Sequence, residues 1–439
     1  MSKTCAPRRL VAVIGVSALV LGLVLAAPAG ATQPVPHPAG HAVPRQVIPA
    51  EPAGIGLFNA AVVYNGQPQD FYWDSASGSL RHAWYSGRWN TETLDGRGSG
   101  YAGARTTDVV GQYAATVVYA GQLHVWYRDD TAGTLRHAWW TGTTWRFEIL
   151  DGTGSGYAGH TSDDTGYFNA VVIYAGQLHV FTLDHGTDEV LRHDWWDGAA
   201  WHLEALDGTG SAYAGHTSDE VGSGTTVAIY GGQLQVFTVD DSTGSLDHDW
   251  WDGARWNFET LDGSASAYPD HSDNIVGTYT SVTVYGGQLH VFTSDFTTGS
   301  TILQSGGVLR HDWWDGTRWH LEALDGSTSA YAGHTADSVG LTNAVAVYGG
   351  QLHVFTFDDM SGSLRHDWWD GTRWRFEAVD GTGSPYGGHT ADSVGVYSAL
   401  ALYGGQLHVW YFDTSSGSLR HAWSSGPGWN FETLDRTLT

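Results

Sequence analysis

Cysteine is nearly absent from this chain of 439 residues, in which Cys5 is the only one. Lysine is equally scarce, since Lys3 has no companion further along the chain. A chain with one cysteine can build neither a disulfide framework nor a cysteine-based metal site, so its fold has to rest on burial. Beyond residue 27 no apolar stretch approaches the roughly 20 residues that a membrane-spanning helix needs. We therefore expect no membrane span in that part of the chain.

The N-terminus has the features of a secretory signal peptide. Lys3, Arg8 and Arg9 precede an apolar run over residues 10–27, and small residues follow at 29–31. We expect residues 1–31 to be a signal peptide, residues 32–54 to be a flexible leader rich in proline and alanine, and the protein to be secreted and extracellular. The Arg8-Arg9 pair leaves the export route, general secretory or twin-arginine, open.

Negative charge dominates the composition. The formal net charge is −26, and removing the signal peptide, with three positive charges and no negative one, takes it to −29. Such a surface disfavours nucleic acid as a partner. It also repels anionic polymers, so a bound glycan is expected to be a neutral or amino sugar rather than an acidic one.

One sequence unit recurs seven times. The segment L-R-H-D-W-W-D-G-T-R-W-H-L-E-A-L-D-G begins at Leu309, and related segments begin at Leu80, Leu135, Leu191, Leu246, Leu364 and Leu419. Successive starts are 55, 56, 55, 63, 55 and 55 residues apart, and an insertion between Phe296 and Val308 accounts for the 63. Repeats of this length indicate a solenoid or a propeller.

Within each unit the pattern predicts four short strands. In the third unit β-branched and aromatic runs cover residues 169–174, 177–183, 190–196 and 201–206, with turn residues between them. Helical periodicity is absent, and four strands in each unit of about 40 to 55 residues are typical of a propeller blade. We predict an all-β fold, a seven-bladed β-propeller with four antiparallel strands per blade. The predicted blades cover residues 55–98, 99–153, 154–209, 210–264, 265–327, 328–382 and 383–439; whether the ring closes by blade packing or by a shared blade stays open.

Two tryptophans recur in every unit. One stands in the third strand, and the other, which we expect to pack between blades, begins the fourth: Trp89, Trp145, Trp201, Trp256, Trp319, Trp374 and Trp429.

The seven units divide into two classes by a correlated substitution. Four units have Thr182, Thr238, Thr293 or Thr356 in the second strand with Asp194, Asp249, Asp312 or Asp367 in the third; the other three have Tyr72, Tyr127 or Tyr411 with Ala83, Ala138 or Ala422. We predict that the members of each pair face each other across antiparallel strands. A similar register would place His179 near Asp197, His290 near Asp315 and His353 near Asp370.

The loops that connect one unit to the next are the long ones, and we expect them all on one face, where a rigid scaffold presents functional residues. Each offers an aromatic ring, a histidine and an acid. These residues are Tyr157, His160 and Asp163; Tyr213, His216 and Asp219; Tyr268, His271 and Asp273; Tyr331, His334 and Asp337; and Tyr386, His389 and Asp392. In the loop before the second blade, Ala104-Arg105 replaces the histidine.

A sugar presents an apolar face and a rim of hydroxyls, which call for an aromatic platform and planar polar groups. The loops supply such groups, and the flanking third strands add Arg192, Arg310, Arg365, Trp195, Trp313 and Trp368. In a competing interpretation the loop tyrosine and histidine only pin the crossover against the neighbouring blade. Two ligands per loop are too few for zinc or calcium, so we expect neither a metal site nor a cofactor.

The repeated glutamates of W-x-x-E do not indicate a glycosidase, because such an enzyme needs one carboxylate pair in one cleft. A feature copied seven times is more typical of a structural or multivalent role than of a catalytic one. We therefore expect that the protein is not an enzyme.

The units resemble the seven-bladed bacterial propeller lectins of the Photorhabdus type, which bind fucose and related glycans, and more loosely the six-bladed fungal fucose lectins. The resemblance lies in G-G-Q-L-H-V-F (Gly286 to Phe292), L-R-H-D-W-W-D-G (Leu309 to Gly316) and the following W-x-x-E-x-L-D-G, and it covers residues 55–439. It implies sugar pockets between blades, lined by tryptophan or tyrosine with polar partners. The function it suggests is a multivalent lectin; the alternative is a secreted platform that binds one protein partner, within a larger and possibly toxin assembly.

Overall fold

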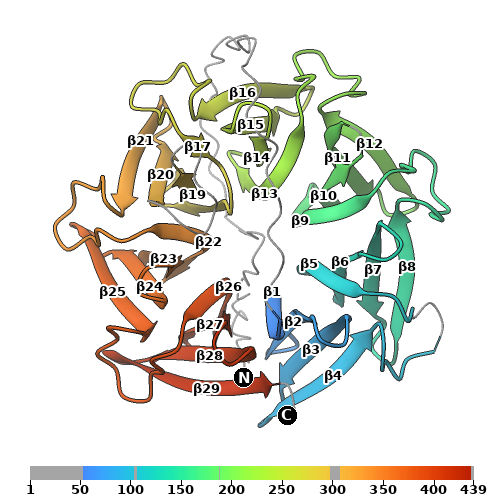
Figure 1. Ribbon diagram of the computed structural model, residues 1–439. Helices are drawn as coiled ribbons and strands as arrows, with labels where there is room; N and C mark the ends of the chain where they lie inside the picture. Colours follow the sequence, from blue (N-terminus) through green and yellow to red (C-terminus); the bar gives the residue numbers. More distant parts are fainter. Residues whose placement is uncertain (1–52, 103–105, 187, 297–306, 437–439) are drawn as a thin grey trace, which may run out of the picture.

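Each sequence repeat forms one antiparallel sheet, and seven sheets surround a central axis (Figure 1). The computed structural model describes residues 53–102, 106–186, 188–296 and 307–436. The predicted signal peptide, nearly all of the predicted leader, Ala104-Arg105 and the insertion at 297–306 lie outside the described residues. The fold is the predicted all-β, seven-bladed β-propeller.

The strands follow the chain outward in each blade, so that the first strand lines the axis and the fourth lies at the periphery (Figure 1). Blades 1 to 3 contain β1 (Ile55–Tyr64), β2 (Gln67–Asp74), β3 (Ser79–Tyr85), β4 (Trp89–Asp95); β5 (Val110–Tyr119), β6 (Gln122–Asp129), β7 (Thr134–Trp140), β8 (Trp145–Asp151); and β9 (Thr165–Tyr174), β10 (Gln177–His185), β11 (Glu189–Trp196), β12 (Trp201–Asp207). Blades 4 and 5 contain β13 (Val221–Tyr230), β14 (Gln233–Asp240), β15 (Ser245–Trp251), β16 (Trp256–Asp262); and β17 (Ile275–Val276), β18 (Ser281–Tyr285), β19 (Gln288–Phe296), β20 (Val308–Trp314), β21 (Trp319–Asp325). Blades 6 and 7 contain β22 (Val339–Tyr348), β23 (Gln351–Asp358), β24 (Ser363–Trp369), β25 (Trp374–Gly381); and β26 (Val394–Tyr403), β27 (Gln406–Asp413), β28 (Ser418–Ser425), β29 (Gly428–Arg436).

The ring closes by blade packing, because β1 to β4 form one sheet and β26 to β29 another. Across the closure, Trp89 Nε1 donates to Glu432 at 2.8 Å and Tyr72 Oη donates to Asp435 at 2.7 Å. No strand is exchanged between these two blades, so side chains and strand-end contacts hold them together.

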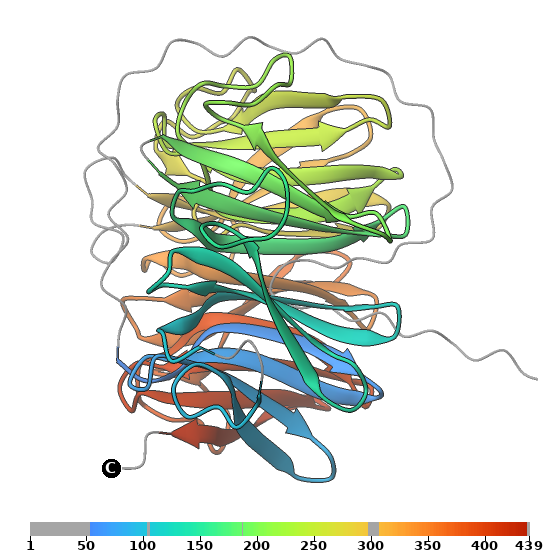
Figure 2. The same ribbon diagram turned by 90° about the vertical axis from the view of Figure 1, so that its right-hand side faces the viewer.

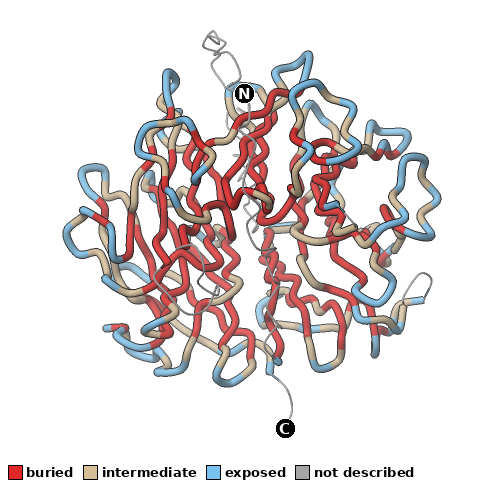
Figure 3. The backbone as a smooth tube through the Cα atoms, turned by 45° about the horizontal axis from the view of Figure 1, so that its top comes forward, coloured by how far each residue is buried: buried red, intermediate tan, exposed pale blue. Residues whose placement is uncertain are grey.

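The two faces of the ring differ. Each crossover loop leads into the first strand of the next blade. This strand begins beside the turn between the second and third strands of the previous blade, where Val110 N, for example, donates to Gly78 O at 3.0 Å. The side view shows β1 starting on the side where β29 ends (Figure 2). The opposite face has only tight hairpins such as Asn65-Gly66, where both residues have positive φ, 49° and 74°. The inner strands are buried and the exposed residues lie mainly in the connections (Figure 3).

The fourth-strand glutamate forms the centre of each junction between blades. Glu377 accepts from His366 Nδ1 at 3.0 Å, from Tyr386 Oη at 2.5 Å and from Trp429 Nε1 of the next blade at 3.2 Å. Burial acts to raise the pKa of Glu377, but these hydrogen bonds lower it below its ordinary value. The second tryptophan set therefore packs between blades as predicted, and it also donates to a buried acceptor.

An aspartate lies at the end of each fourth strand; it is buried in blades 1 to 6, and its equivalent in blade 7, Asp435, is half-buried. The Oδ1 atom of Asp380 accepts from Gly381 N at 2.9 Å and from Thr390 N at 2.7 Å, which holds the crossover loop. Its Oδ2 atom accepts from Tyr411 Oη at 2.6 Å and from Arg420 Nε at 2.9 Å, both in the next blade. One carboxylate thus fixes its own loop and the neighbouring sheet.

The correlated pairs are diagonal neighbours, and the prediction that they face each other directly is wrong. Thr182 lies opposite Arg192, and Asp194 lies opposite Val180. Because side chains alternate, residues two positions apart share one face of the sheet. Both positions act on the fourth-strand aspartate of the preceding blade. In three blades a tyrosine hydroxyl donates to this aspartate. In the other four its charge helps to raise the pKa of the buried third-strand aspartate.

The predicted proximity of second-strand histidines to the turn aspartates is also wrong. His179 Nδ1 lies 2.9 Å from His193 Nε2, while Asp197 bonds His202 at 2.8 Å. The same holds for the other two copies: His290 and His353 pair with His311 and His366, while Asp315 and Asp370 pair with His320 and Arg375. The register of the second and third strands places the two histidines on one face, with the rings stacked. Burial and the neighbouring imidazole lower the pKa of His179 to about 3.

Replacing Glu377 with alanine removes the acceptor of three buried donors. We expect Glu377→Ala to lower the free energy of unfolding by about 2 to 4 kcal/mol, because unpaired buried donors retain their desolvation cost. Urea unfolding followed by tryptophan fluorescence measures this. Glu377→Gln, which keeps one acceptor oxygen, is the matched control, and an equal loss in both variants would contradict the account.

The raised pKa of Asp367 leads us to expect that the stability of the protein depends on pH. Burial raises the pKa of Asp367 well above its ordinary value, and the neighbouring Asp325 adds to this. Because the folded-state pKa exceeds the unfolded value of about 3.9, the contribution of the group is complete below about pH 4 and is lost as the pH rises through the folded pKa. We expect Asp367→Asn to flatten the decline in unfolding free energy from about pH 4 to about pH 8 and to be more stable than wild type at the upper end.

Denaturant unfolding at a series of pH values tests this expectation. Asp392→Asn, in an exposed loop, should leave the slope as it is in wild type. An Asp367→Asn slope equal to that of wild type would show that the carboxyl is already ionised in the folded state.

Candidate functional site

The predicted loop tyrosines lie at the blade junctions, half-buried. Tyr157 Oη donates to Glu148 at 2.8 Å, and Tyr331 Oη donates to Glu322 at 2.8 Å. The same bond joins Tyr213 to Glu204, Tyr268 to Glu259 and Tyr386 to Glu377. Each tyrosine therefore ties the crossover loop to the fourth strand that precedes it, a contact that fits the pinning interpretation.

The predicted loop histidines and acids lie nearer to solvent. His160, His271 and His389 hydrogen-bond through Nδ1 to the carbonyl of the loop tyrosine three residues earlier, and His216 and His334 to the carbonyl of the following threonine. The backbone amides of Asp163, Asp219, Asp337 and Asp392 are bonded to a threonine hydroxyl two residues before them. Asp163, Asp273 and Asp392 are exposed. Their predicted role in ligand binding stays a prediction.

The predicted arginines and tryptophans occupy the junction itself. Arg192, Arg310 and Arg365 are buried, and their Nε atoms donate to Asp151, Asp262 and Asp325 of the preceding blade. Trp195 lies between the rings of His193 and His202, with centroids 4.8 and 4.9 Å away. Trp313 is stacked in the same way between His311 and His320, and Trp368 stacks on His366. The guanidinium groups are thus engaged inside the protein, while the half-buried indoles continue a column of stacked rings.

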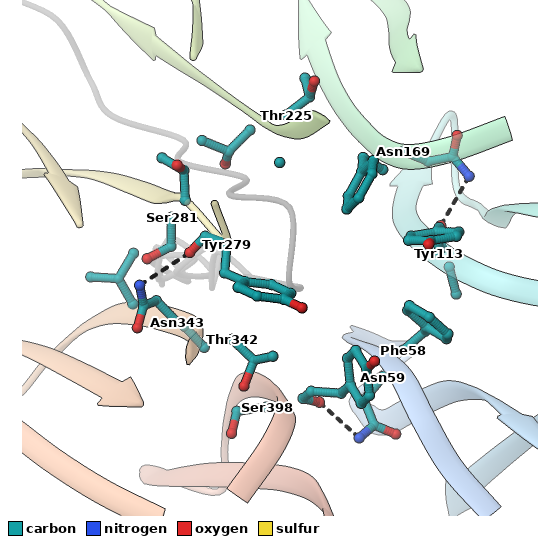
Figure 4. A pocket seen from close by; sticks show the side chains of 18 of the residues that line it. Phe58, Asn59, Tyr113, Asn169, Thr225, Tyr279, Ser281, Thr342, Asn343 and Ser398 are labelled. Carbon is teal, nitrogen blue, oxygen red and sulfur yellow. Dashed lines mark hydrogen bonds between the residues drawn. The ribbon is translucent and has the colours of Figure 1, made fainter. Parts of the chain in front are cut away.

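A pocket that we did not predict lies on the axis (Figure 4). It has a volume of about 900 Å³, counting solvent at its open mouth, and residues of the first strands line it. Seven equivalent positions, one per blade, project toward it: Phe58, Tyr113, Phe168, Gly224, Tyr279, Thr342 and Tyr397. Five of the seven are aromatic.

The backbone explains how these side chains reach the axis. In β9 the pairing with β10 shifts between Ala170 and Tyr167, so that Phe168 stands at a bulge. Its φ is 49°, and the seven equivalent residues have φ between 49° and 60°, a conformation that residues with side chains seldom adopt. A bulge turns one side chain away from the regular alternation, here into the channel.

The next residue stabilises the bulge. Asn59 Nδ2 donates to Gly56 O and to Tyr397 O, both at 2.9 Å, and Asn169 repeats this with Gly166 O and Tyr113 O. Asn343 Nδ2 likewise donates to Tyr279 O at 3.1 Å. Each asparagine bonds the carbonyl of the aromatic residue in the preceding blade, so these amides connect neighbouring blades at the axis.

Four of the rings form a continuous arc. The centroid of Phe58 lies 4.5 Å from that of Tyr397 and 4.4 Å from that of Tyr113, and Tyr113 lies 4.8 Å from Phe168. Gly224 follows, where a Cβ atom would lie 2.8 Å from Gly277 O. The pocket therefore has an aromatic wall on the side of blades 7, 1, 2 and 3, and a mixed wall elsewhere, where the ring of Tyr279 lies among hydroxyl, amide and small apolar groups.

The lining is uncharged. It contains asparagine, threonine, serine and tyrosine among apolar residues, and none of the described lining residues is acidic, basic or histidine. The Oδ1 atoms of Asn59 and Asn343 are buried without a hydrogen-bond partner in the described structure. Such a pocket fits an uncharged ligand with an apolar face and hydrogen-bonding groups.

The sequence contains a signal for this pocket near the start of each unit. It is a four-residue pattern in which glycine comes first, the third residue lines the pocket and varies, and the fourth is usually polar. It is G-L-F-N from Gly56, G-Y-F-N from Gly166 and G-T-Y-T from Gly277. Positions that are constant among the seven units are easily recognised, whereas this position varies among phenylalanine, tyrosine, threonine and glycine.

No protein-family model matches the chain, and no curated protein matches it. Among solved structures, a mutant Aleuria aurantia lectin in complex with alpha-methyl-L-fucoside is 20% identical, covers 73% of this chain and 94% of its own, and has a TM-score of 0.42. The SapL1 lectin in complex with alpha methyl fucoside is 17% identical over 75% of this chain and 96% of its own, with a TM-score of 0.44. A structure described as a new family of polysaccharide lyase, an ulvan lyase, is 11% identical over 90% of this chain and 98% of its own, with a TM-score of 0.55. At these identities the likeness shows the β-propeller fold alone.

No helix in the described residues has the length and hydropathy needed to cross a bilayer.

Thr342 is the β-branched residue of the axial set, and its φ of 51° strains it most. We expect Thr342→Asn to raise the free energy of unfolding by about 1 kcal/mol, because asparagine tolerates this conformation better. Thermal and urea unfolding measure the change. A lower stability in the variant would show that packing of the threonine outweighs the backbone strain.

Proposed function

We propose that this chain is a secreted, non-enzymatic carbohydrate-binding protein of the seven-bladed propeller lectin type, and that a neutral sugar occupies the axial pocket. The observation that carries the proposal is the arc of four contiguous aromatic rings beside buried amide and hydroxyl groups in one pocket. Aromatic rings stack on the apolar face of a sugar, and the polar groups bond its hydroxyls.

The charge of the pocket supports a neutral ligand. The protein has a net charge of −26, but no charged side chain is among the described residues that line this pocket. An acidic glycan would lack a cationic partner here and would be repelled by the protein as a whole. A neutral hexose or deoxyhexose avoids both costs.

Two observations support binding without turnover. Hydrolysis of a glycoside calls for a pair of carboxyl groups flanking the scissile bond, and no aspartate or glutamate is among the described lining residues. The glutamates of the repeated W-x-x-E accept hydrogen bonds from histidine and tyrosine inside the junctions, as Glu148 does at 2.8 Å from each.

The crossover loops provide further candidate sites on the same protein. Five loops repeat a tyrosine and a histidine around one face, and His160 and His389 are exposed there. Weak sites of this kind gain strength when several engage one glycan surface. The axial pocket and the loop sites are therefore separate parts of the proposal and need separate variants.

The proposal is tested with an array of neutral, amino and acidic glycans, followed by calorimetry with the best ligand. We expect retention of a neutral glycan, and a loss of affinity of about five- to tenfold in Tyr113→Leu and in Phe168→Leu, because each ring contributes roughly 1 to 1.5 kcal/mol of stacking. The matched control is the double variant His160→Ala and His389→Ala, which alters the loops alone.

Two results would count against the proposal in different ways. Silence across the whole array would reject carbohydrate binding. Wild-type affinity in both axial variants, together with reduced binding in the loop double variant, would move the sugar site from the axis to the crossover loops.

A further inference from the structure

The aromatic wall of the axial pocket continues beyond the pocket in one direction. Tyr113 lines the pocket (Figure 4), and its ring centroid lies 5.5 Å from that of Tyr167. Tyr167 directly precedes Phe168 in β9, so it lies one residue nearer to the face of the crossover loops. The ring of His185, the last residue of β10, lies 5.3 Å from that of Tyr167. A second row of rings therefore runs from Tyr113 toward this face.

A buried arginine holds Tyr167 in place. The guanidinium carbon of Arg128, in the second strand of the preceding blade, lies 3.7 Å from the centroid of the Tyr167 ring. Arg128 is 2% exposed, and its Nη1 atom donates to Asp164 Oδ1 at 2.6 Å and to Thr165 O at 2.7 Å. Tyr167 Oη donates to the other oxygen of Asp164 at 3.0 Å. The cation on its ring and the bond at its hydroxyl fix Tyr167 in one position.

The other copies of the repeat form the same junction without these residues. The position of Arg128 is occupied elsewhere by uncharged residues, which are Trp73, Leu183, Val239, Ser294, Phe357 and Phe412. The position of Tyr167 is occupied elsewhere by residues without an aromatic ring, which are Leu57, Gln112, Ser223, Thr278, Leu341 and Val396. Burying an arginine has a desolvation cost, and six blades pair their strands without that cost. The departure at the junction of blades 2 and 3 therefore points to a role other than blade packing.

Two aspartates beside Tyr167 are open to solvent. The side chain of Asp164 is 41% exposed and that of Asp130 is 48% exposed, and Arg128 donates to both. A carboxylate has about four lone-pair sites, so each aspartate can also accept from a ligand hydroxyl. One arginine and two aspartates leave one net negative charge, which disfavours an acidic ligand. An aromatic ring and exposed acceptors thus lie together, as the recognition of a neutral sugar requires.

We propose that the ligand is an oligosaccharide of neutral sugars, whose terminal unit occupies the axial pocket and whose second unit contacts the half-buried ring of Tyr167. Hydroxyls of the second unit donate to Asp130 and Asp164. The proposal rests on the sugar site proposed above and adds a second subsite to it, toward the face of the crossover loops. Because Arg128 and Asp164 fix Tyr167 before the ligand arrives, binding at this ring loses little conformational freedom.

The test compares sugars of different length. Calorimetry on the full chain uses the methyl glycosides of glucose, galactose, mannose and fucose, and disaccharides and trisaccharides that end in the same sugars. We expect the disaccharide of the series that binds to be held about three- to tenfold more tightly by wild type than its methyl glycoside, because it gains one ring contact. Tyr167→Leu introduces the residue that blades 1 and 6 have at this position. In this variant the disaccharide should lose its advantage, while the methyl glycoside keeps its wild-type affinity.

Further variants separate contact with the ligand from support of the fold. Tyr167→Phe keeps the ring and loses only the bond to Asp164, so it should retain most of the advantage of the disaccharide. Tyr174→Leu removes another half-buried tyrosine at the far end of the same strand and should bind both sugars as wild type does. If Tyr167→Leu does not fold, Asp130→Asn supplies the second measurement at an exposed residue. It should lower the affinity for the disaccharide alone by about threefold or more.

The outcomes distinguish the second subsite from the pocket on which it rests. Equal affinity of wild type for the methyl glycoside and the disaccharide would overturn the second subsite, and so would a disaccharide advantage that persists in Tyr167→Leu. In either case, weaker binding of both sugars in Tyr113→Leu would still support the axial site. A chain that binds no neutral glycan of any length would reject the pocket and the subsite together.

Discussion

The arrangement of the ring depends on one carboxylate per blade, the aspartate at the end of the fourth strand, which is buried in six blades and half-buried in the seventh. Its two oxygens have separate tasks, since one accepts from the backbone of the crossover loop and the other from the next blade. Loop conformation and blade docking are therefore set by the same side chain. A chain with one cysteine cannot form a disulfide within itself. The hydrogen bonds of this aspartate, together with those that histidine, tyrosine and tryptophan donate to the glutamate, hold the blades together instead.

The same carboxylate explains why the blades come in two classes. In three blades a tyrosine hydroxyl donates to it, and in the other four the charge of this carboxylate helps to raise the pKa of a buried third-strand aspartate. Asp367 shows the second arrangement most directly, because burial and then the charge of Asp325 raise its pKa well above the ordinary value. The choice between the two chemistries affects how the junctions respond to pH, while the sheet geometry stays the same.

The fold could be predicted from the sequence because the same strand pattern occurs seven times. Seven copies with turn residues at fixed offsets leave few folds other than a propeller. Side-chain partners were harder to predict. Thr182 and Asp194 vary together, but covariation cannot separate a direct neighbour from a diagonal one when every second residue shares a face. The role of Arg192 depends on Asp151 in the preceding blade, and a repeat considered by itself does not reveal contacts with its neighbour. The axial pocket was missed because a strand pattern assumes regular alternation, and the bulge at Phe168 breaks it.

Because of that bulge, the inner strand can form the sheet and line the channel with different residues. The residues on either side of it pair with the second strand and fill the core, whereas the bulged residue points into the channel and takes no part in sheet pairing. Phenylalanine, tyrosine, threonine and glycine all occupy this position among the seven blades, and the backbone conformation is the same in each. The side chains at this position can consequently be exchanged without a change in sheet pairing, which makes the channel the part of this molecule most open to acquiring a new ligand without a new fold.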